Sequence, residues 1–486
     1  MKGKVKNLGD IIADVNCSVA GNIDDIEIKR LDCDSREVKG GSLFFCVSGT
    51  DSDGHDYAES AVKNGAVAII CERQLDNIDV PQIIVKNTRL AMAAVAVEFY
   101  DHPAEKMRVI GITGTNGKTT TTYMLKAIFE AIGKKVGIIG TICTMIGDKK
   151  LHSDRTTPDS IHLQELFYEM NENGVDIVIM EVSSHALDQN RVGGILFDVV
   201  EFTNITVDHL DYHHTFENYF NAKKKLFDMC VNGTVNIDDE HGRELLSECT
   251  CPITTFGLDS RADLFAKDIE YATTHTDFTL CKGKDGIRIR VPIPGKFTVY
   301  NALGAASVAQ LCGVEFEDIC KGLSEMHGVP GRIESLPTYG RNIAVYLDYA
   351  HTPDALENII KSVREIGAHH RIVTLFGCGG DRDNSKRATM GEIAGRLSDF
   401  LVVTSDNPRT EDPMSIIDMI LPGVKKTDCP YVVIENRLDA IKFALLNAQE
   451  NDIIILAGKG HEDYQEINGE KHHFDEKEIV DELLRN

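Results

Sequence analysis

The stretch MRVIGITGTNGKTT at residues 107–120 decides the fold of this chain. Its first seven residues form a short, almost entirely apolar run, which is typical of a buried parallel strand. A glycine-rich loop follows directly, and residues 119–133 then have helical spacing. A strand, a glycine loop and a helix N-terminus in this order predict a phosphate-binding loop, because backbone N–H groups and the helix end both attract anions. Lys118 could reach the β- and γ-phosphates of a nucleotide, and Thr119 could reach Mg²⁺.

The loop is a variant of the usual phosphate-loop pattern. Ile112 occupies the position of the first glycine in G-x-x-x-x-G-K-[ST], so the motif in this chain is G-x-x-G-K-T-T. A glycine-rich turn that binds nothing is the alternative interpretation. The apolar strand before the loop and the helix after it favour phosphate binding.

Further apolar runs after the loop predict the rest of the central domain and a C-terminal domain. Runs at 135–141, 176–182 and 197–204 repeat the buried-strand pattern, with helical stretches between them. This alternation predicts a central, doubly wound and mostly parallel sheet. Five more strand candidates lie at 343–350, 371–377, 399–405, 431–435 and 452–458. Helical segments at 353–366 and 438–448 separate some of them and predict a Rossmann-like α/β domain.

The first hundred residues form a smaller α/β pattern. Residues 42–48 and 66–71 are expected as strands, and 88–100 as a helix. The chain is therefore predicted to hold three α/β domains, at 1–102, 103–330 and 331–486. A length of 486 residues fits this number, since one core rarely grows beyond about 300 residues.

Composition excludes several classes of protein. With 42% hydrophobic and 26% charged residues the chain is ordinary globular material, and no apolar run is long enough to span a membrane. The N-terminus lacks the apolar stretch of a secretory signal. A net charge of −25 disfavours nucleic acid as a partner. Thirteen scattered cysteines without a C-x-x-C pair predict a reducing compartment, the cytoplasm.

The loop TGTNGKTT at 113–120 resembles the ATP loop of the Mur ligase family. The family's other motifs follow in its order, as EVSSH at 181–185, Asn204 with DHLD at 208–211, YNA at 300–302, GRIE at 331–334 and DYAHTP at 348–353. EVSSHAL and DHLDYH are similar to the family's tripeptide synthetases, which join a diamino acid to UDP-N-acetylmuramoyl-L-alanyl-D-glutamate. The resemblance implies an ATP-dependent ligase of peptidoglycan precursor synthesis that forms an acyl phosphate on the substrate carboxylate. We expect a monomer with no membrane span.

The resemblance also implies a Mg²⁺ site. It assigns catalytic roles to Lys118, Glu181, His209 and Lys223, and makes Thr119 a metal ligand together with the last three. Lys223 would act as a carbamate formed with CO₂, because an ammonium would repel the metal. From the residues alone, His209, His213 and His214 could equally suggest zinc, and Lys223–Lys225 a solvated basic face.

Substrate contacts are implied at three further groups of positions. For ATP these are Gly114, Thr115, Asn116, Gly117, Lys118, Thr119, Thr120, Asn301, Arg332 and Asp348. For the UDP-sugar substrate they are Ser35, Thr50, Asp51, Ser52, Thr156, Thr157, Ser183, Gln189 and Arg191. Turn and capping chemistry is the alternative for the Ser and Thr residues. The role of His351, in the DYAHTP motif, is left open.

The segment Asp406-Asn407-Pro408-Arg409 resembles the signature of relatives that add meso-diaminopimelate rather than L-lysine. The distal carboxylate of diaminopimelate can pair with an arginine fork, which lysine cannot use. The remaining implied contacts to the diamino acid are Arg382, Gly458 and Glu462. The alternatives are the L-lysine-adding reaction, folylpolyglutamate synthase and a non-catalytic nucleotide-binding scaffold. The N-terminal domain and the DNPR segment argue against folylpolyglutamate synthase. The presence of Lys118, Glu181, His209 and Lys223 argues against a non-catalytic scaffold.

Overall fold

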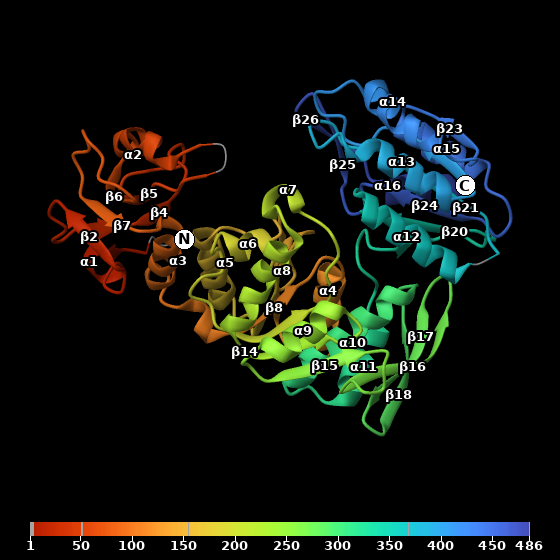
Figure 1. The fold of residues 1–486 in the computed structure, drawn as a ribbon, viewed down its shortest axis with the longest axis horizontal. Helices are drawn as coiled ribbons and strands as arrows, with labels where there is room; N and C mark the ends of the chain where they lie inside the picture. The colour runs from red at the N-terminus through yellow and green to blue at the C-terminus, as the bar shows by residue number, and fades with distance from the viewer. Residues whose placement is uncertain (1–3, 50–51, 154, 368, 486) are drawn as a thin grey trace. The chain divides into compact units, whose positions relative to one another are not determined.

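The computed structural model describes residues 4–49, 52–153, 155–367 and 369–485 (Figure 1). Thr50 and Asp51, both predicted substrate contacts, lie outside the described residues. The chain packs as two compact units. The first comprises Met1–Lys118, Phe129–Thr255 and Ser307–Gly313, and the second Thr119–Ile128, Phe256–Ala306 and Val314–Asn486. Each of the three large sheets falls within one predicted domain range. The domain limits themselves stay a prediction.

The N-terminal region contains a five-stranded sheet in the order β2-β7-β6-β5-β4. The strands predicted at 42–48 and 66–71 are its neighbours β5 and β6, which run parallel. The elements of this region are β1 (Lys6–Asn7), α1 (Leu8–Ile11), β2 (Cys17–Ala20), β3 (Glu27–Ile28), β4 (Arg30–Asp32), β5 (Ser42–Phe45), η1 (Gly54–Tyr57), α2 (Ala58–Asn64), β6 (Ala66–Cys71), β7 (Gln82–Val85) and α3 (Thr88–Phe99).

An eleven-stranded sheet forms the middle of the chain, in the order β11-β10-β9-β12-β8-β13-β14-β15-β16-β17-β18. The strand of the phosphate loop, β8, lies between β12 and β13 and is parallel to both. The elements up to the end of the parallel part are η2 (Pro103–Lys106), β8 (Arg108–Thr113), α4 (Lys118–Ala131), β9 (Val136–Ile139), β10 (Thr144–Ile146), β11 (Lys149–Leu151), α5 (Ser160–Glu172), β12 (Ile177–Glu181), α6 (Ser184–Asp188), β13 (Phe197–Phe202), α7 (Leu210–His213), α8 (Phe216–Lys224), η3 (Lys225–Met229), β14 (Cys230–Asn236), α9 (Glu240–Glu248) and β15 (Ile253–Gly257).

The last three strands of this sheet form an antiparallel meander that the apolar runs did not predict. In β18, buried and exposed residues alternate towards the end of the strand, so no continuous apolar run marks it. The elements here are β16 (Leu264–Tyr271), β17 (Thr276–Lys282), β18 (Asp285–Val291), α10 (Lys296–Leu311) and α11 (Phe316–Glu325).

The C-terminal region holds a six-stranded sheet in the order β19-β20-β24-β21-β22-β23, and all five predicted strands are present. The pairs from β20 to β23 are parallel, and helices α13 and α14 pack together beside the sheet (Figure 1). The elements are β19 (Glu334–Ser335), β20 (Ala344–Asp348), α12 (Pro353–Ile366), β21 (Ile372–Phe376), α13 (Lys386–Leu397), β22 (Phe400–Val403), α14 (Pro413–Val424), β23 (Tyr431–Val433), α15 (Arg437–Leu446), β24 (Ile453–Ala457), β25 (Tyr464–Ile467), β26 (Glu470–His473) and α16 (Glu476–Arg485). The predicted α/β class with mostly parallel sheets is confirmed.

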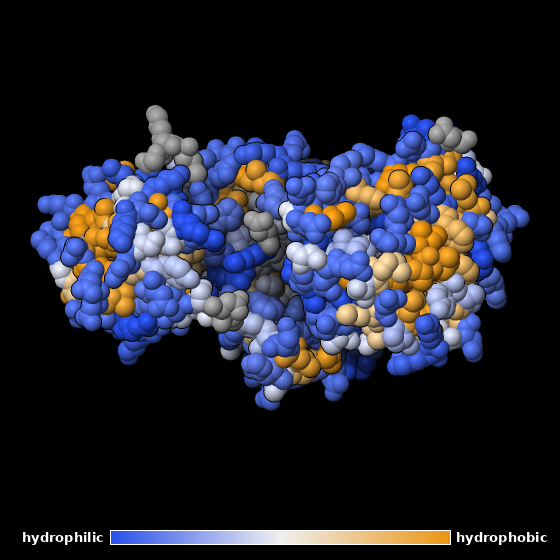
Figure 2. Space-filling view, turned by 90° about the horizontal axis from the view of Figure 1, so that it is seen from above, coloured by the Kyte–Doolittle hydropathy of each residue, from blue (hydrophilic) through white to orange (hydrophobic). Residues whose placement is uncertain are grey.

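Local sequence fixes where the helices begin. Thr352 caps α12 by accepting a hydrogen bond from the N–H of Ala355, and Pro353 occupies the first helical position. Asp159 caps α5 in the same way. The face in Figure 2 is mainly hydrophilic, with hydrophobic residues in separate patches. Across the described residues, none of the helices combines the length and apolar character that crossing a membrane requires.

Candidate active site

The loop at residues 114–117, between β8 and α4, depends on two glycines. Gly114 has a φ of +143° and Gly117 a φ of +89°, a region that side chains disfavour. A methyl group on Gly114 would lie only 2.0 Å from the Thr203 Oγ1 atom. The loop can therefore take this shape only with glycine at residue 114.

Two residues at the end of β13 hold the loop in place. The Asn204 carbonyl accepts the N–H of Thr115 at 2.8 Å, and the Asn204 side-chain oxygen accepts the N–H of Asn116 at 3.1 Å. The Thr203 hydroxyl donates to the Asn116 carbonyl at 2.7 Å. Sequence reasoning missed Thr203, although its position between an apolar strand and Asn204 was a usable signal.

The two lysines predicted to act in catalysis meet at one oxygen atom. Lys118, the first residue of α4, donates from Nζ to the carbonyls of Gly114 and Thr115, both at 2.9 Å. Lys223 in α8 donates from Nζ to the same Gly114 carbonyl at 2.8 Å. Two ammonium groups at one carbonyl repel each other, so this arrangement favours one charged and one neutral amine.

Lys223 is the better candidate for the neutral amine. Its side chain is fully buried, and its Nζ lies 4.6 Å from the centre of the Tyr219 ring. Burial lowers the pKa of the Lys223 amine well below its ordinary value, and the Lys118 charge lowers it further. By contrast, Lys224 pairs with Glu248, and the exposed Lys225 pairs with Asp188.

Glu181 ends β12 beside the loop strand and is buried. Its two carboxylate oxygens accept the backbone N–H and the hydroxyl of Thr141, both at 3.0 Å. The Thr141 hydroxyl also lies 3.0 Å from that of Thr156, a predicted substrate contact. A methyl group on Gly140 would lie 2.4 Å from the Glu181 Oε1 atom, so a glycine there leaves room for the carboxylate.

Four predicted substrate contacts form one network behind Glu181. The Thr157 hydroxyl donates to the Glu181 carbonyl at 2.9 Å and accepts the N–H of Ser183 at 3.1 Å. Arg191 donates to the Thr157 carbonyl at 2.8 Å and to the Gln189 side-chain oxygen at 2.8 Å. The structure therefore brings these residues together at the carboxyl end of β12, where ligands bind in parallel sheets.

His209 follows β13 and has a φ of +53°. Its ring packs against that of His185 with the centroids 4.9 Å apart. Burial lowers the pKa of His209; Asp208 opposes the shift, and the charge of Lys118 adds to it. The neutral imidazole that results is the form that ligates metals.

Without a carbamate on Lys223, the side chains present supply only part of the predicted Mg²⁺ site. Glu181 supplies a carboxylate, Thr119 a buried hydroxyl and His209 a neutral imidazole, and hard cations prefer oxygen ligands. Within 4–49, 52–153, 155–367 and 369–485, no three His, Cys, Asp or Glu side chains converge as a metal site. His213 instead lies with its Nε2 atom 2.9 Å from the Ser184 hydroxyl.

The three predicted ATP contacts outside the phosphate loop, Asn301, Arg332 and Asp348, lie in the second unit. Asp348 ends β20, and its carboxylate accepts the N–H groups of Ile333 at 2.8 Å and Ala350 at 2.9 Å. Burial raises the pKa of Asp348, and the nearby Arg332 charge opposes that shift. The Arg332 guanidinium lies 5.3 Å from the centre of the Tyr349 ring. Asn301 is buried in α10. The His351 ring lies 4.6 Å from the Tyr349 ring, which places it beside Arg332 and Asp348.

A cavity of about 1070 Å³ lies between the N-terminal region and the segment before α5. The predicted contacts Ser35 and Ser52 line it, and so do Arg36, Arg155 and His162. Acidic residues line it as well, and Arg36 pairs with one of them, Asp34, at 2.5 Å. Sequence reasoning missed Arg155, although it directly precedes the two predicted threonines.

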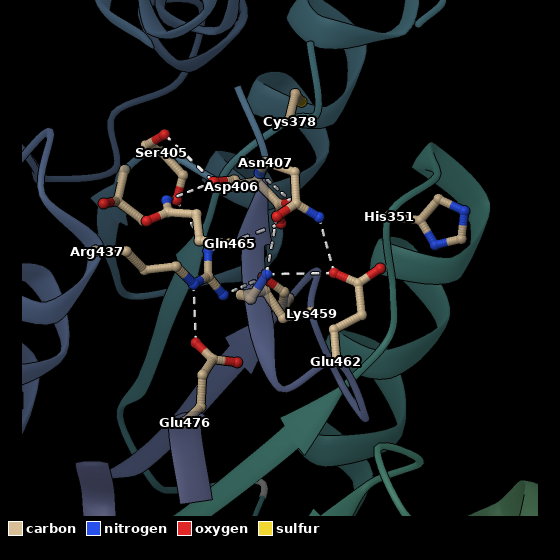
Figure 3. Close-up of polar contacts among 12 residues, drawn as sticks. His351, Cys378, Ser405, Asp406, Asn407, Arg437, Lys459, Glu462, Gln465 and Glu476 are labelled. Atoms are coloured by element: carbon tan, nitrogen blue, oxygen red, sulfur yellow. Dashed lines mark hydrogen bonds and ion pairs between the residues drawn. The ribbon is translucent and has the colours of Figure 1, made fainter. Parts of the chain in front are cut away.

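Three of the predicted amino-acid contacts, Asp406, Asn407 and Glu462, lie in a hydrogen-bonded group at the carboxyl ends of β22 and β24 (Figure 3). The Asn407 amide donates to Glu462 at 2.8 Å. Lys459, a buried residue that sequence reasoning missed, donates to Asn407 at 3.1 Å and to Glu462 at 3.2 Å. A methyl group on Gly458 would lie 2.4 Å from the Asp406 Oδ2 atom, which makes glycine necessary there. Burial raises the pKa of Glu462.

Below this group lies an ion pair that sequence reasoning also missed. Arg437 is fully buried and pairs with Glu476 at 2.8 Å (Figure 3). It also donates to the Ala457 carbonyl at 2.9 Å, at the end of β24. No sequence pattern marked Arg437, because an arginine at the start of a helix is usually exposed.

Arg409 and Arg382 flank a single glycine. Arg409 donates from Nη1 to the Gly380 carbonyl at 2.7 Å. A methyl group on Gly379 would lie 3.1 Å from that Nη1 atom and 4.0 Å from the Cγ atom of the exposed Arg382. Pro408 precedes Arg409, and its carbonyl oxygen would lie 1.9 Å from a methyl group on Gly380. The two predicted arginines are therefore neighbours.

The phosphate loop and the parallel sheets place this chain in the class of α/β proteins that bind nucleotides. Comparison with known families narrows this class. "Mur ligase family, catalytic domain" matches residues 27–100, "Mur ligase middle domain" residues 112–309, and "Mur ligase, glutamate ligase domain" residues 331–460. The chain belongs to the Mur ligase family, which confirms the resemblance of the sequence motifs.

Individual relatives match over nearly their whole length. The UDP-N-acetylmuramoyl-L-alanyl-D-glutamate--2,6-diaminopimelate ligase 1 of Clostridium acetobutylicum is 47% identical over 99% of this chain and 98% of its own. The ligase of the same name from Clostridium botulinum is 45% identical over 94% and 95%. A solved structure with that name has a TM-score of 0.71 at 29% identity and covers 99% of both chains.

Proposed function

We propose that this enzyme joins meso-diaminopimelate to UDP-N-acetylmuramoyl-L-alanyl-D-glutamate in an ATP-dependent reaction of peptidoglycan precursor synthesis. The full-length likeness to ligases named for this reaction carries the proposal. The group formed by Asn407, Arg409, Lys459 and Glu462 supports the choice of amino acid, because it offers both a cation and an anion to a zwitterionic distal end. The thirteen cysteines are free thiols, which supports the cytoplasm as the compartment.

The reaction activates a carboxylate before an amine attacks it. The γ-phosphoryl group of ATP passes to the substrate carboxylate, the amine attacks the acyl phosphate, and phosphate leaves. The glycine loop, the N-terminus of α4 and the Lys118 ammonium would hold the phosphates, since a helix N-terminus and an ammonium both attract anions. Arg191, with Thr157 and Ser183, would hold the substrate near Glu181.

The proposed metal ligands are Thr119, Glu181, His209 and Lys223 as a carbamate. Bound Mg²⁺ would screen the negative charges of ATP and the substrate carboxylate. The lowered pKa of Lys223 supports the carbamate, because only the neutral amine adds CO₂. A carbamate would also place an anionic oxygen beside Lys118, which would relieve the repulsion between the two amines at the Gly114 carbonyl.

The test is ADP release in the presence of the UDP-muramoyl dipeptide, ATP and Mg²⁺, with meso-diaminopimelate or L-lysine as the amine. We expect release with diaminopimelate and little with lysine. Release with lysine alone would keep the family reaction but overturn the proposed amino acid. Release with neither amine would overturn the proposed function.

A further inference from the structure

The backbone of Arg409 is held in a conformation that a non-glycine residue rarely adopts. Its φ is +53°, in the left-handed region. Its N–H donates to the Glu466 carbonyl at 3.1 Å, and its own carbonyl accepts the N–H of Asn468 at 2.7 Å. Arg409 also forms a parallel bridge with Ile467. Both polar backbone groups of Arg409 are therefore fixed by the hairpin β25–β26.

The same hairpin holds the Arg409 side chain. Its Nε atom donates to the Glu466 carboxylate at 3.0 Å, while Nη1 donates to the Gly380 carbonyl at 2.7 Å. The side chain of Arg409 is 20% exposed and that of Glu466 is 25% exposed. The two bonds use two of the five N–H donors of the guanidinium and leave others for a carboxylate. The plane of the Arg409 guanidinium is thus set before any substrate binds.

Strand β25 extends this support along the DNPR segment. The Gln465 side chain donates to the Asp406 carbonyl at 2.6 Å (Figure 3). The N–H of Glu466 donates to the Asn407 side-chain oxygen at 3.0 Å. That bond also orients the Asn407 amide, whose NH₂ group then faces Glu462. One strand therefore contacts Asp406, Asn407 and Arg409, and Glu466 supplies three of the contacts.

We propose that Glu466 is a specificity-determining residue, which positions the Arg409 guanidinium to pair with the distal carboxylate of the incoming amino acid. The proposal rests on the proposed function, since it assumes that this pocket takes a diamino dicarboxylic acid. A bidentate pair needs a guanidinium of fixed orientation, and a free arginine side chain samples many rotamers. Holding the fork in advance lowers the ordering cost of binding. Glu466 is a positioning residue, because it acts through Arg409.

The experiment compares Glu466→Gln with Glu470→Gln in the full-length enzyme. Gln keeps the size of the side chain but loses its charge, and Glu470 is an exposed residue of the same hairpin. For Glu466→Gln we expect the KM for meso-diaminopimelate to rise about tenfold, the loss typical of a charge-assisted hydrogen bond. The KM for ATP and the Tm should stay near the wild-type values, and Glu466→Asp should recover part of the loss. Glu470→Gln should match the wild type.

Two results would overturn the inference. An unchanged KM for diaminopimelate in Glu466→Gln would show that the ion pair does not position Arg409. A parallel rise in the KM for ATP would show a general structural role instead. Both results leave the proposed function intact, provided that the wild-type enzyme uses diaminopimelate. A wild-type enzyme that does not use it would overturn the proposed function and this inference together.

Discussion

Two loops that follow parallel strands differ in how they reach a left-handed backbone. The phosphate loop after β8 uses Gly114 and Gly117, whereas the loop after β22 places Arg409 at a φ of +53°. Glycine suits the first loop because its ligand is expected to contact backbone N–H groups. The second loop needs a side chain at that position, so it keeps the disfavoured backbone and holds it with β25. Backbone recognition and side-chain recognition thus place different demands on the sequence.

The largest expected effect is on the glycine loop. Gly114→Ala should reduce ATP-dependent turnover by at least about 1000-fold, because the methyl group would collide with Thr203 and displace several N–H donors. Steady-state ADP release measures this loss. Gly133→Ala is the matched control: Gly133 has a φ of +76° but no atom within 4 Å of its added methyl group. Equal losses in the two variants would show that backbone strain, and not the collision, matters.

Removing the buried amine beside the loop should have the next largest effect. Lys223→Ala should lower ligation by about 100-fold or more, as expected for a lost metal ligand, while the fold remains intact. Lys224→Ala, which removes a partly exposed ion pair, should leave ligation unchanged. Near-normal turnover of Lys223→Ala would remove Lys223 from the proposed metal site.

Lys223 should also make stability depend on pH. Its pKa is lowered in the folded protein, so the unfolded chain binds a proton that the folded chain does not, between the lowered pKa and the ordinary one. Stability linked to Lys223 should therefore increase as pH rises through that window. Lys223→Met should flatten this dependence and raise the Tm near neutral pH. Denaturant unfolding at several pH values, in CO₂-free buffer, measures the difference.

Substitution of Arg409 tests the second loop of the comparison, in which a side chain is expected to contact the substrate. Arg409→Ala should raise the KM for diaminopimelate by roughly 10- to 100-fold, the effect of losing hydrogen bonds to a charged group, and change the KM for ATP little. Arg396→Ala, at an exposed position on α13, is the control. If both KM values rose together, Arg409 would be a structural residue and the comparison would lose its basis.

The smallest effect is expected from Glu462. Burial raises its pKa, so its carboxylate is lost at a higher pH than an ordinary glutamate as the solution is acidified. The KM for diaminopimelate should then rise about fivefold on the acidic side, the cost of roughly one hydrogen bond. Glu462→Gln should show the higher KM at every pH. A wild-type profile as flat as that of the variant would exclude an ammonium contact at Glu462.

The sequence predicted the parallel strands well because most of them are buried on both faces. The runs at β8, β12 and β24 are mostly apolar, and such runs are hard to mistake. The meander of β16–β18 was missed, since its strands are partly exposed and lack continuous apolar runs. The small hairpin β25–β26 was missed for the same reason: all of β26 is exposed.

The candidate site was predicted less evenly. The phosphate loop could be found from its own residues, because the glycines and Lys118 that mark it are adjacent in the sequence. The burial of Lys223 could not, because three consecutive lysines look alike in sequence while the helix turns them to different faces, and only Lys223 is buried. Lys459, Arg437 and Glu466 were missed because each bonds to a residue between 39 and 57 positions away in the sequence.

The collision at Gly114 also bears on how resistance to an inhibitor could arise. A compound that bound to the backbone of residues 114–117 would depend on groups that a codon change cannot remove. Substitution of Gly114 itself would bring a side chain within 2.0 Å of Thr203 and damage the enzyme together with the binding site. A compound that bound to Arg409 could be escaped by one substitution at the cost of diaminopimelate affinity. The backbone loop is therefore the part of this site where selection has the fewest viable mutations to choose from.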